Sequence, residues 1–490
     1  MTGWEIVLVI AAYFLLLIII SRLTAGKGDN DTFFTGNRNS PWYVVAFGMI
    51  GASLSGVTFI SIPGWVENSQ FSYMQMVLGY LAGYAVIALI LLPLYYRLNL
   101  TSIYTYLDQR FGNSSYLSGA LFFIFSRIIG ASFRLFLVAM VFDQFIFKQL
   151  EIDLAFHWIV LITIALIWVY TNKGGIKTVI WTDTLQTTFM LLAVVLTIVG
   201  IQSYMGLNLG ELIDQIAASN YSKIFYFDNI GGESKHFVKQ FLGGMFIAIA
   251  MTGLDQDMMQ KNLTCRNLKD AQKNMLWFSI VLVFVNLMFL ALGALLYMYA
   301  GSNGIEASGD LLFPSVAFHE LMPGTITVCF VLGLIASAYS SADSALTSLT
   351  TSFTVDVLQI EKRDMNMSRW SKKQIRQMVH IGMSLILVVV IVIFNQVKDE
   401  SVIEKLFKVA SYTYGPLLGL YSFGLFTKKI VYDKWVPLVA IASPIICYVL
   451  NSNSENWFNY KFGFELLLLN GLITFIGLLA ISKADGRTAM

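Results

Sequence analysis

The segment from Thr325 to Val357 reads TITVCFVLGLIASAYSSADSALTSLTTSFTVDV and joins an apolar run to a second half rich in side-chain oxygens. On an α-helix the serines at positions 337, 340, 341, 344 and 348 share one face, because they follow the i, i+3, i+4, i+7, i+11 spacing. Asp343 lies at the edge of this face. Since Na⁺ prefers oxygen ligands and membrane proteins hold it near the bilayer midplane, the segment predicts one wall of a sodium site.

A purely structural role for these serines is the alternative. Small hydroxyl residues allow helices to pack closely, and they donate hydrogen bonds to carbonyls one turn back. That role explains the hydroxyls but not Asp343, because a lone carboxylate at mid-membrane depth costs at least about 2.5 kcal/mol. A cation site accounts for both.

The composition is that of a membrane protein. Of the 490 residues 57% are hydrophobic and 13% are charged, whereas soluble domains are about 25% charged. Apolar runs of about 20 residues predict an all-α polytopic fold with about thirteen transmembrane helices. The expected spans are residues 4–23, 41–63, 72–96, 117–147, 156–171, 179–204, 238–260, 274–300, 323–357, 377–397, 402–427, 433–451 and 463–482. The alternating segments of a membrane β-barrel do not occur.

The distribution of lysine and arginine predicts the orientation in the membrane. Arg22, Lys27 and Arg38 follow the first span, so the positive-inside rule places that loop in the cytoplasm and the N-terminus outside. Basic residues return in every second loop, including the cluster from Lys261 to Lys273, and predict a cytoplasmic C-terminus. We expect a multi-pass monomer in the lipid bilayer of the plasma membrane. The net charge of +2 gives no sign of a nucleic-acid partner.

Two spans, 41–63 and 238–260, are unusually rich in glycine and begin two successive groups of five spans. Glycines also serve tight helix packing, but interrupted helices at matching positions favour an inverted-repeat transporter. The expected division is 1–40 for an extra N-terminal helix and cytoplasmic loop, 41–204 for the first five-helix repeat, 205–237 for an extracellular loop, 238–427 for the second repeat, and 428–490 for two peripheral helices and a cytoplasmic tail.

The sequence does not predict an enzyme. The four histidines, at positions 157, 236, 319 and 380, are scattered, and no Ser-His-Asp or metal-ligand spacing appears. The cysteines at 265, 329 and 447 lie far apart and indicate neither a disulfide framework nor a metal site. We therefore expect no cofactor apart from Na⁺ as a coupling ion.

Several segments carry a family resemblance. In chain order they are Leu54 to Pro63 (LSGVTFISIP), Gly174-Gly175, Val179 to Gln186 (VIWTDTLQ), Asp255-Gln256, Ser340-Ser341, Phe353 to Asp356 (FTVD) and Gly415 to Leu420 (GPLLGL). Together they resemble the sodium/solute symporter family, which includes the sodium/glucose, proline, pantothenate and sialic acid transporters. The first segment is most similar to the sialic acid members. The resemblance covers nearly the whole chain and implies a LeuT-type core of two inverted five-helix repeats, with one extra helix before it and two after it.

The resemblance implies a first sodium site between the broken helix 41–63 and the helix 323–357. Carried over to this sequence, Gly51, Leu54 and Ser337 supply carbonyl oxygens, and Ser340 and Ser341 supply hydroxyls. The local sequence agrees, because glycines flank a stretch that can unwind, and a freed carbonyl in the membrane is tolerated where a cavity or an ion satisfies it.

A second sodium site occurs in some members, and the matching residues here are Asp183, Ser340, Asp343 and Ser344. Asp343 departs from the pattern, since those members carry Ser or Thr there. Two carboxylates bind one cation more tightly, but with the site empty they repel and one takes a proton. The cation at this site is then Na⁺ or H⁺. The alternative is a structural Asp343 that pairs with an arginine.

Substrate contacts are expected from the oxygens of Ser53, Ser55 and Thr58 in the broken helix, with Thr252 and Gln75 as weaker candidates. The sugar-transporting members carry a glutamate at one position and an aromatic gate at another, and this chain has neither feature at the matching positions. Val77 and the Met251-Thr252 pair stand at those places, which disfavours glucose or galactose.

Arg134 lies in the middle of a predicted span, where an arginine has a specific partner. The partner is a substrate carboxylate or one of the chain's own aspartates, Asp143, Asp183 or Asp343. An arginine of this helix binds the substrate acid in the sialic acid members, but the aligned position here is Gly130.

The sequence as a whole predicts a sodium-coupled secondary active symporter. It would import a small polar or anionic organic solute, such as sialic acid, another carboxylate, an amino acid or a vitamin, by alternating access. The competing hypotheses are a sodium-conducting channel or solute sensor on the same scaffold, and a proton-coupled symporter.

Overall fold

Long apolar helices form most of the part of the chain that the computed structural model describes, which comprises residues 3–24, 30–148, 151–171, 175–360, 370–396 and 402–483. The helices are α1 (Gly3–Thr24), α2 (Asn30–Thr35), α3 (Trp42–Ser53), α4 (Gly56–Ser69), α5 (Tyr73–Val86), α6 (Leu92–Arg97), α7 (Thr105–Arg110), α8 (Asn113–Val141), α9 (Phe156–Thr171), α10 (Gly175–Met205), α11 (Leu209–Ala218), α12 (Phe237–Ala248), α13 (Gln256–Asn262), α14 (Leu268–Ser302), α15 (Leu312–Ala317), α16 (Gly324–Ser352), α17 (Lys372–Phe394), α18 (Val402–Thr413), α19 (Gly415–Phe426), α20 (Val436–Phe458) and α21 (Leu466–Ala480). Two short strands, β1 (Ile430–Val431) and β2 (Ser482–Lys483), pair antiparallel.

The predicted all-α polytopic membrane fold is confirmed. Within the described residues eight helices are long and apolar enough to cross a membrane, and two bent helix pairs each qualify as one further span. Three shorter apolar helices, α9, α19 and α21, accompany them. These segments are compatible with the expected thirteen spans, although membrane crossing by the three short helices stays a prediction.

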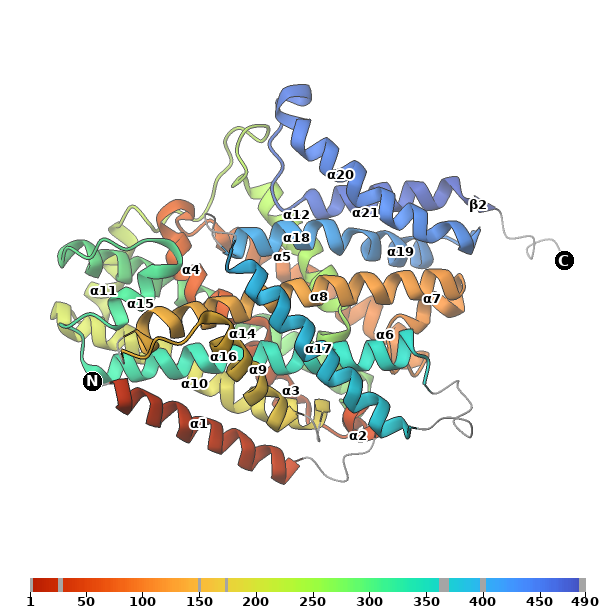
Figure 1. Ribbon diagram of the computed structural model, residues 1–490. Coiled ribbons are helices and arrows are strands. Elements are labelled where there is room, and N and C mark those ends of the chain that lie inside the picture. Colours follow the sequence, from red (N-terminus) through yellow and green to blue (C-terminus); the bar gives the residue numbers. More distant parts are fainter. Residues whose placement is uncertain are drawn as a thin grey trace.

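The helices form a bundle in which α16 lies near the centre. Helix α16 packs along α10, α10 packs along α3, and α5 packs along α12. In Figure 1 helix α1 covers one side of the bundle, and α20 and α21 cover the opposite side. Segments far apart in sequence therefore meet at α16, whose described residues from Gly333 to Ser352 are all buried.

The two bent spans are those in which the sequence predicted an interruption. Helices α3 and α4 meet at an angle of 54°, and the helix Phe237–Gly253, which comprises α12 and a π-helical turn, meets α13 at 69°. Their positions agree with two repeats, 41–204 and 238–427, but that division stays a prediction.

The break between α3 and α4 has a local cause. Ser55 is extended, with φ −74° and ψ 178°, and Gly56 begins α4. A Cβ atom at Gly56 would lie 3.6 Å from the carbonyl oxygen of Arg134 and 3.7 Å from Cα of Ala338. The break is therefore held between α8 and α16. Because unwound backbone is tolerated at membrane depth where it is buried in protein or lines a cavity, its position marks the site.

Candidate functional site

A central cavity of about 80 Å³ lies at the break between α3 and α4. Its walls come from α3, α4, α5, α8, α14, α18 and the bend between α12 and α13. The predicted substrate residues that line it are Ser53, Ser55, Thr58, Arg134 and Thr252. Sequence reasoning missed the tyrosines and the asparagine of its wall, Tyr73, Tyr80, Tyr84 and Asn286. The cavity thus combines hydroxyl groups, one amide and two arginines, a lining suited to a small polar solute.

Gln75 does not line this cavity, so its role as a substrate residue stays a prediction that the geometry does not support. Its side-chain amide donates to the carbonyl oxygen of Lys235 at 2.8 Å, and its side-chain oxygen accepts from the backbone N–H of Tyr226 at 3.1 Å. Gln75 therefore fixes the segment before α12 to α5. A glutamine in a span satisfies both ends of its amide, and here the backbone of the loop does so.

Arg134 lines the cavity with 7% of its surface exposed. Its Nε and Nη1 atoms have no hydrogen-bond partner among the described residues. The aspartates that the sequence offered as its partners pair elsewhere: Asp143 Oδ2 lies 3.9 Å from Lys148 Nζ, and Asp183 pairs with Lys261. The third, Asp343, accepts from Tyr170 and Thr182. A buried guanidinium with free donors is costly, which indicates that a ligand completes the site.

Arg127, one turn before Gly130 on the same helix, is in contrast paired. Its Nη2 atom contacts Asp257 Oδ2, and Nη1 lies 3.9 Å from Asp255 Oδ2. Asp255 is held further by Tyr414, whose hydroxyl donates to Oδ2 at 2.5 Å, and it caps α13 by accepting from the N–H of Asp257 at 2.9 Å. Arg127 therefore ties α8 to the bend before α13 through its terminal nitrogen atoms, while its Nε atom has no hydrogen-bond partner among the described residues. Arg134 is the cavity's arginine that forms no ion pair with any described carboxylate.

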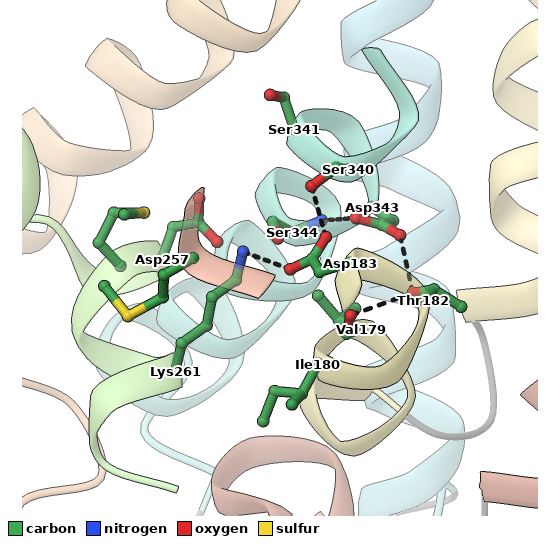
Figure 2. Close-up of polar contacts among 12 residues, drawn as sticks. Val179, Ile180, Thr182, Asp183, Asp257, Lys261, Ser340, Ser341, Asp343 and Ser344 are labelled. Atoms are coloured by element: carbon green, nitrogen blue, oxygen red, sulfur yellow. Dashed lines mark hydrogen bonds and ion pairs between the residues drawn. The ribbon is translucent and has the colours of Figure 1, made fainter. Parts of the chain in front are cut away.

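The serine side chains of α16 point in two different directions. Ser340 Oγ donates to Asp183 Oδ1 on α10 at 2.5 Å, whereas Ser341 Oγ points away from that carboxylate and lies 3.4 Å from the carbonyl oxygen of Ser337 (Figure 2). The buried hydroxyl of Ser344 has no hydrogen-bond partner among the described residues.

The predicted first sodium site lies where the α3–α4 break meets α16. Gly51 and Leu54 are the α3 side of that break, and Gly56 brings the chain against Ala338, the residue after Ser337. The structure thus brings the two groups of predicted ligands to adjoining helices. The site itself stays a prediction.

The residues of the predicted second site also lie together, at the contact of α10 with α16. Asp183 accepts from Ser340, while Asp343 Oδ1 accepts from the N–H of Ser344 at 2.6 Å. Asp343 Oδ2 accepts from the hydroxyls of Tyr170 at 3.2 Å and Thr182 at 3.4 Å. No arginine pairs with Asp343 among the described residues, so the structural alternative given for this aspartate is not observed.

Lys261 is the residue of this site that sequence reasoning missed. It was assigned to a cytoplasmic basic cluster, but the structure buries it at 1% exposure, with Nζ at 2.7 Å from Asp183 Oδ2 (Figure 2). One signal in the sequence points to it. Asp257 and Lys261 stand four residues apart at the end of the seventh predicted span, a spacing that places them on one face of a helix.

Comparison with known proteins gives a consistent picture. The family model described as "Sodium:solute symporter family" matches residues 33–433. The "Sodium/sialic acid symporter NanT" of Aliivibrio fischeri is 24% identical over 462 residues, which are 91% of this chain and 88% of that protein. The "Sodium/iodide cotransporter" of Homo sapiens is 25% identical over 419 residues, 82% of this chain and 62% of that protein.

A solved structure shares the fold. It is a Na⁺-coupled sialic acid symporter in a substrate-bound outward-open state, with a TM-score of 0.81, 20% identity and 98% of each chain covered. Since this identity is low, the likeness shows the fold alone.

Proposed function

Because the chain belongs to the sodium:solute symporter family, we propose that the solute it carries with Na⁺ is a small organic anion, bound at Arg134 in the central cavity. The observation that carries this proposal is the guanidinium with two nitrogen atoms unpaired at 7% exposure. A planar guanidinium matches a carboxylate bidentately, and such charge-assisted bonds are about twice as strong as neutral ones.

The surroundings of Arg134 support an anion over a cation or a neutral sugar. Arg127, beside it, is already neutralised by Asp257, so the net charge facing the cavity from α8 is positive. The hydroxyl groups of Ser53, Ser55 and Thr58 would serve the other polar groups of the solute. Two relatives, by their printed names, act on sialic acid and on iodide, which are both anions.

A second cavity, of about 570 Å³, lies between the end of α4 and the loop from α20 to α21. Lys235, Lys408 and Lys461 line it together with a single acidic residue, Glu455. A basic vestibule concentrates anions near the mouth of a binding site and increases their rate of association. On the orientation predicted from the basic loops, with the N-terminus outside and the C-terminus inside the plasma membrane, this vestibule faces outward.

For the coupling ion we propose the first sodium site, with carbonyl oxygens of Gly51, Leu54 and Ser337 and hydroxyls of Ser340 and Ser341. A helix end leaves carbonyl groups without a partner in its own helix, and α3 ends at this break. The adjoining α16 offers hydroxyls. Because the same break lines the cavity, a cation bound there would order the segment that also contacts the solute. That shared segment is a physical basis for coupling.

Transport in proteoliposomes tests the proposal. Labelled N-acetylneuraminate, lactate, pantothenate and glucose are offered with an inward Na⁺ gradient, and the anion that is taken up is then compared between the wild type, Arg134→Gln and Arg134→Lys. We expect Arg134→Gln to weaken anion affinity by about 1.5–3 kcal/mol, roughly tenfold to a hundredfold, because a charge-assisted bond is lost. Arg134→Lys keeps the positive charge but cannot bind a carboxylate through two parallel N–H donors, so it should lose less anion affinity than Arg134→Gln.

The melting temperature separates ligand binding from a structural role. Since no described aspartate pairs with Arg134, the melting temperature of Arg134→Gln should lie within a few degrees of that of the wild type. Uptake of glucose alone, or wild-type anion affinity in Arg134→Gln, would overturn the proposal.

A further inference from the structure

The second cation position of this chain contains a cation that belongs to the protein. The Lys261 ammonium lies 2.7 Å from Asp183 Oδ2, and the other oxygen of the same carboxylate accepts from Ser340. Asp183 and Ser340 are two of the four residues expected to hold a second ion. At 1% exposure the ammonium is shielded from water, so Asp183 is its main source of compensation.

The neighbouring charges keep Lys261 in this place. Asp257, one turn earlier on α13, lies on the same helix face as Lys261, but its Oδ2 atom is bound by Arg127. Its Oδ1 atom has no hydrogen-bond partner among the described residues. The two bases and two acids thus alternate from α8 through α13 to α10 as Arg127, Asp257, Lys261 and Asp183.

Asp343 does not require a metal ion to be satisfied. Its two oxygens accept from one backbone N–H and from the hydroxyls of Tyr170 and Thr182, all within the bundle. A sodium ion at Asp183 would in contrast need to sit beside the ammonium, and two monovalent cations at this distance in a dry interior repel strongly.

We propose that Lys261 is a tethered cation that fills the second cation position, so that the protein moves one Na⁺ with each solute through the first site alone. This inference rests on the proposed function, since it concerns the number of ions and not the identity of the solute. A single residue on α13 then sets the stoichiometry. Replacing Lys261 with a neutral side chain opens the position at Asp183 to a second Na⁺.

The test is the Na⁺-to-solute ratio in proteoliposomes, measured as the membrane potential that stops net solute flux at fixed gradients. We expect a ratio of one in the wild type and two in Lys261→Gln, with the Hill coefficient for Na⁺ rising from about one toward two. Two controls fix the cause. Lys261→Arg keeps a cation at Asp183, and Lys261→Gln combined with Asp183→Asn removes the carboxylate as well, so both should show a ratio of one.

A binding measurement covers the case in which Lys261→Gln folds poorly because Asp183 is left unpaired. Purified protein is heated in NaCl or choline chloride. Na⁺ should raise the melting temperature of Lys261→Gln more than that of the wild type, because the ion replaces the lost ammonium. In Lys261→Gln combined with Asp183→Asn, Na⁺ should raise the melting temperature no more than it does in the wild type.

A ratio of two in the wild type overturns the inference while leaving the symporter proposal intact, and so does an unchanged ratio of one in a folded Lys261→Gln. Solute uptake that does not depend on Na⁺ in the wild type would instead contradict the proposed coupling site. The two failures are therefore distinguishable.

Discussion

At the scale of single residues the hydroxyls of α16 differ in what they are free to do. Ser341 lies toward the predicted first sodium site, and its contact with the carbonyl oxygen of Ser337 is long, at 3.4 Å. Ser348, on the same face, donates to the carbonyl oxygen of Ala345 at 3.0 Å. A hydroxyl that is weakly engaged can turn to a cation, whereas one that is bonded within its own helix serves that helix.

Ser341→Ala should therefore weaken Na⁺ activation of uptake, and Ser348→Ala should not. Loss of one ligand oxygen to a cation is expected to cost about 1.5–3 kcal/mol, roughly a tenfold to hundredfold rise in the Na⁺ concentration for half-maximal uptake. Both variants should melt within a few degrees of the wild type, since each loses one buried hydroxyl. Equal Na⁺ dependence in Ser341→Ala and Ser348→Ala would show that the first site is misplaced.

At the scale of helices, sequence reasoning located the breaks but not all the contacts between helices. The glycines of 41–63 and 238–260 predicted both interruptions, because glycine is a signal local in the chain. The role of Lys261 could not be read in the same way, since its partner Asp183 lies on α10, and only the packed bundle brings the two together. The contacts of Gln75 could not be predicted for the same reason: its partners are backbone groups of a loop distant in the sequence.

Close helix packing explains other glycines and gives a stability prediction. A Cβ atom on Gly244 of α12 would lie 2.1 Å from the carbonyl oxygen of Met76 on α5, whereas one on Gly382 of α17 would meet nothing within 4 Å. Gly244→Ala should destabilise the protein by about 1–3 kcal/mol, because the helices must separate. Gly382→Ala is the matched control and should be neutral or slightly stabilising, since alanine favours a helix. Thermal unfolding in detergent measures both, and equal melting temperatures would contradict the observed packing.

At the scale of the whole molecule the buried charges form a connected set around the cavity. Arg127, Asp257, Lys261 and Asp183 link α8, α13 and α10, while Arg134 stands apart and forms no ion pair among the described residues. The sequence identified Arg134 as an arginine with a specific partner, but its position in the span could not show whether that partner was an aspartate of the chain or a ligand. The distinction depends on the bend before α13, which brings Asp255 and Asp257 to Arg127 and not to Arg134.

A double-mutant cycle tests this division of roles between the arginines. Arg127→Gln strands Asp257 in the membrane interior and should lower the free energy of unfolding by about 3–5 kcal/mol, the usual cost of breaking a buried pair from one side. Adding Asp257→Asn removes the stranded charge, so stability should largely return. The same second change combined with Arg134→Gln should bring no recovery, because those two residues are not partners, and non-interacting sites add independently. If Asp257→Asn instead restores function or stability to Arg134→Gln, then Arg134 spends part of the transport cycle paired with Asp257, and its free donors would reflect one conformation of the protein and not a site kept open for the anion.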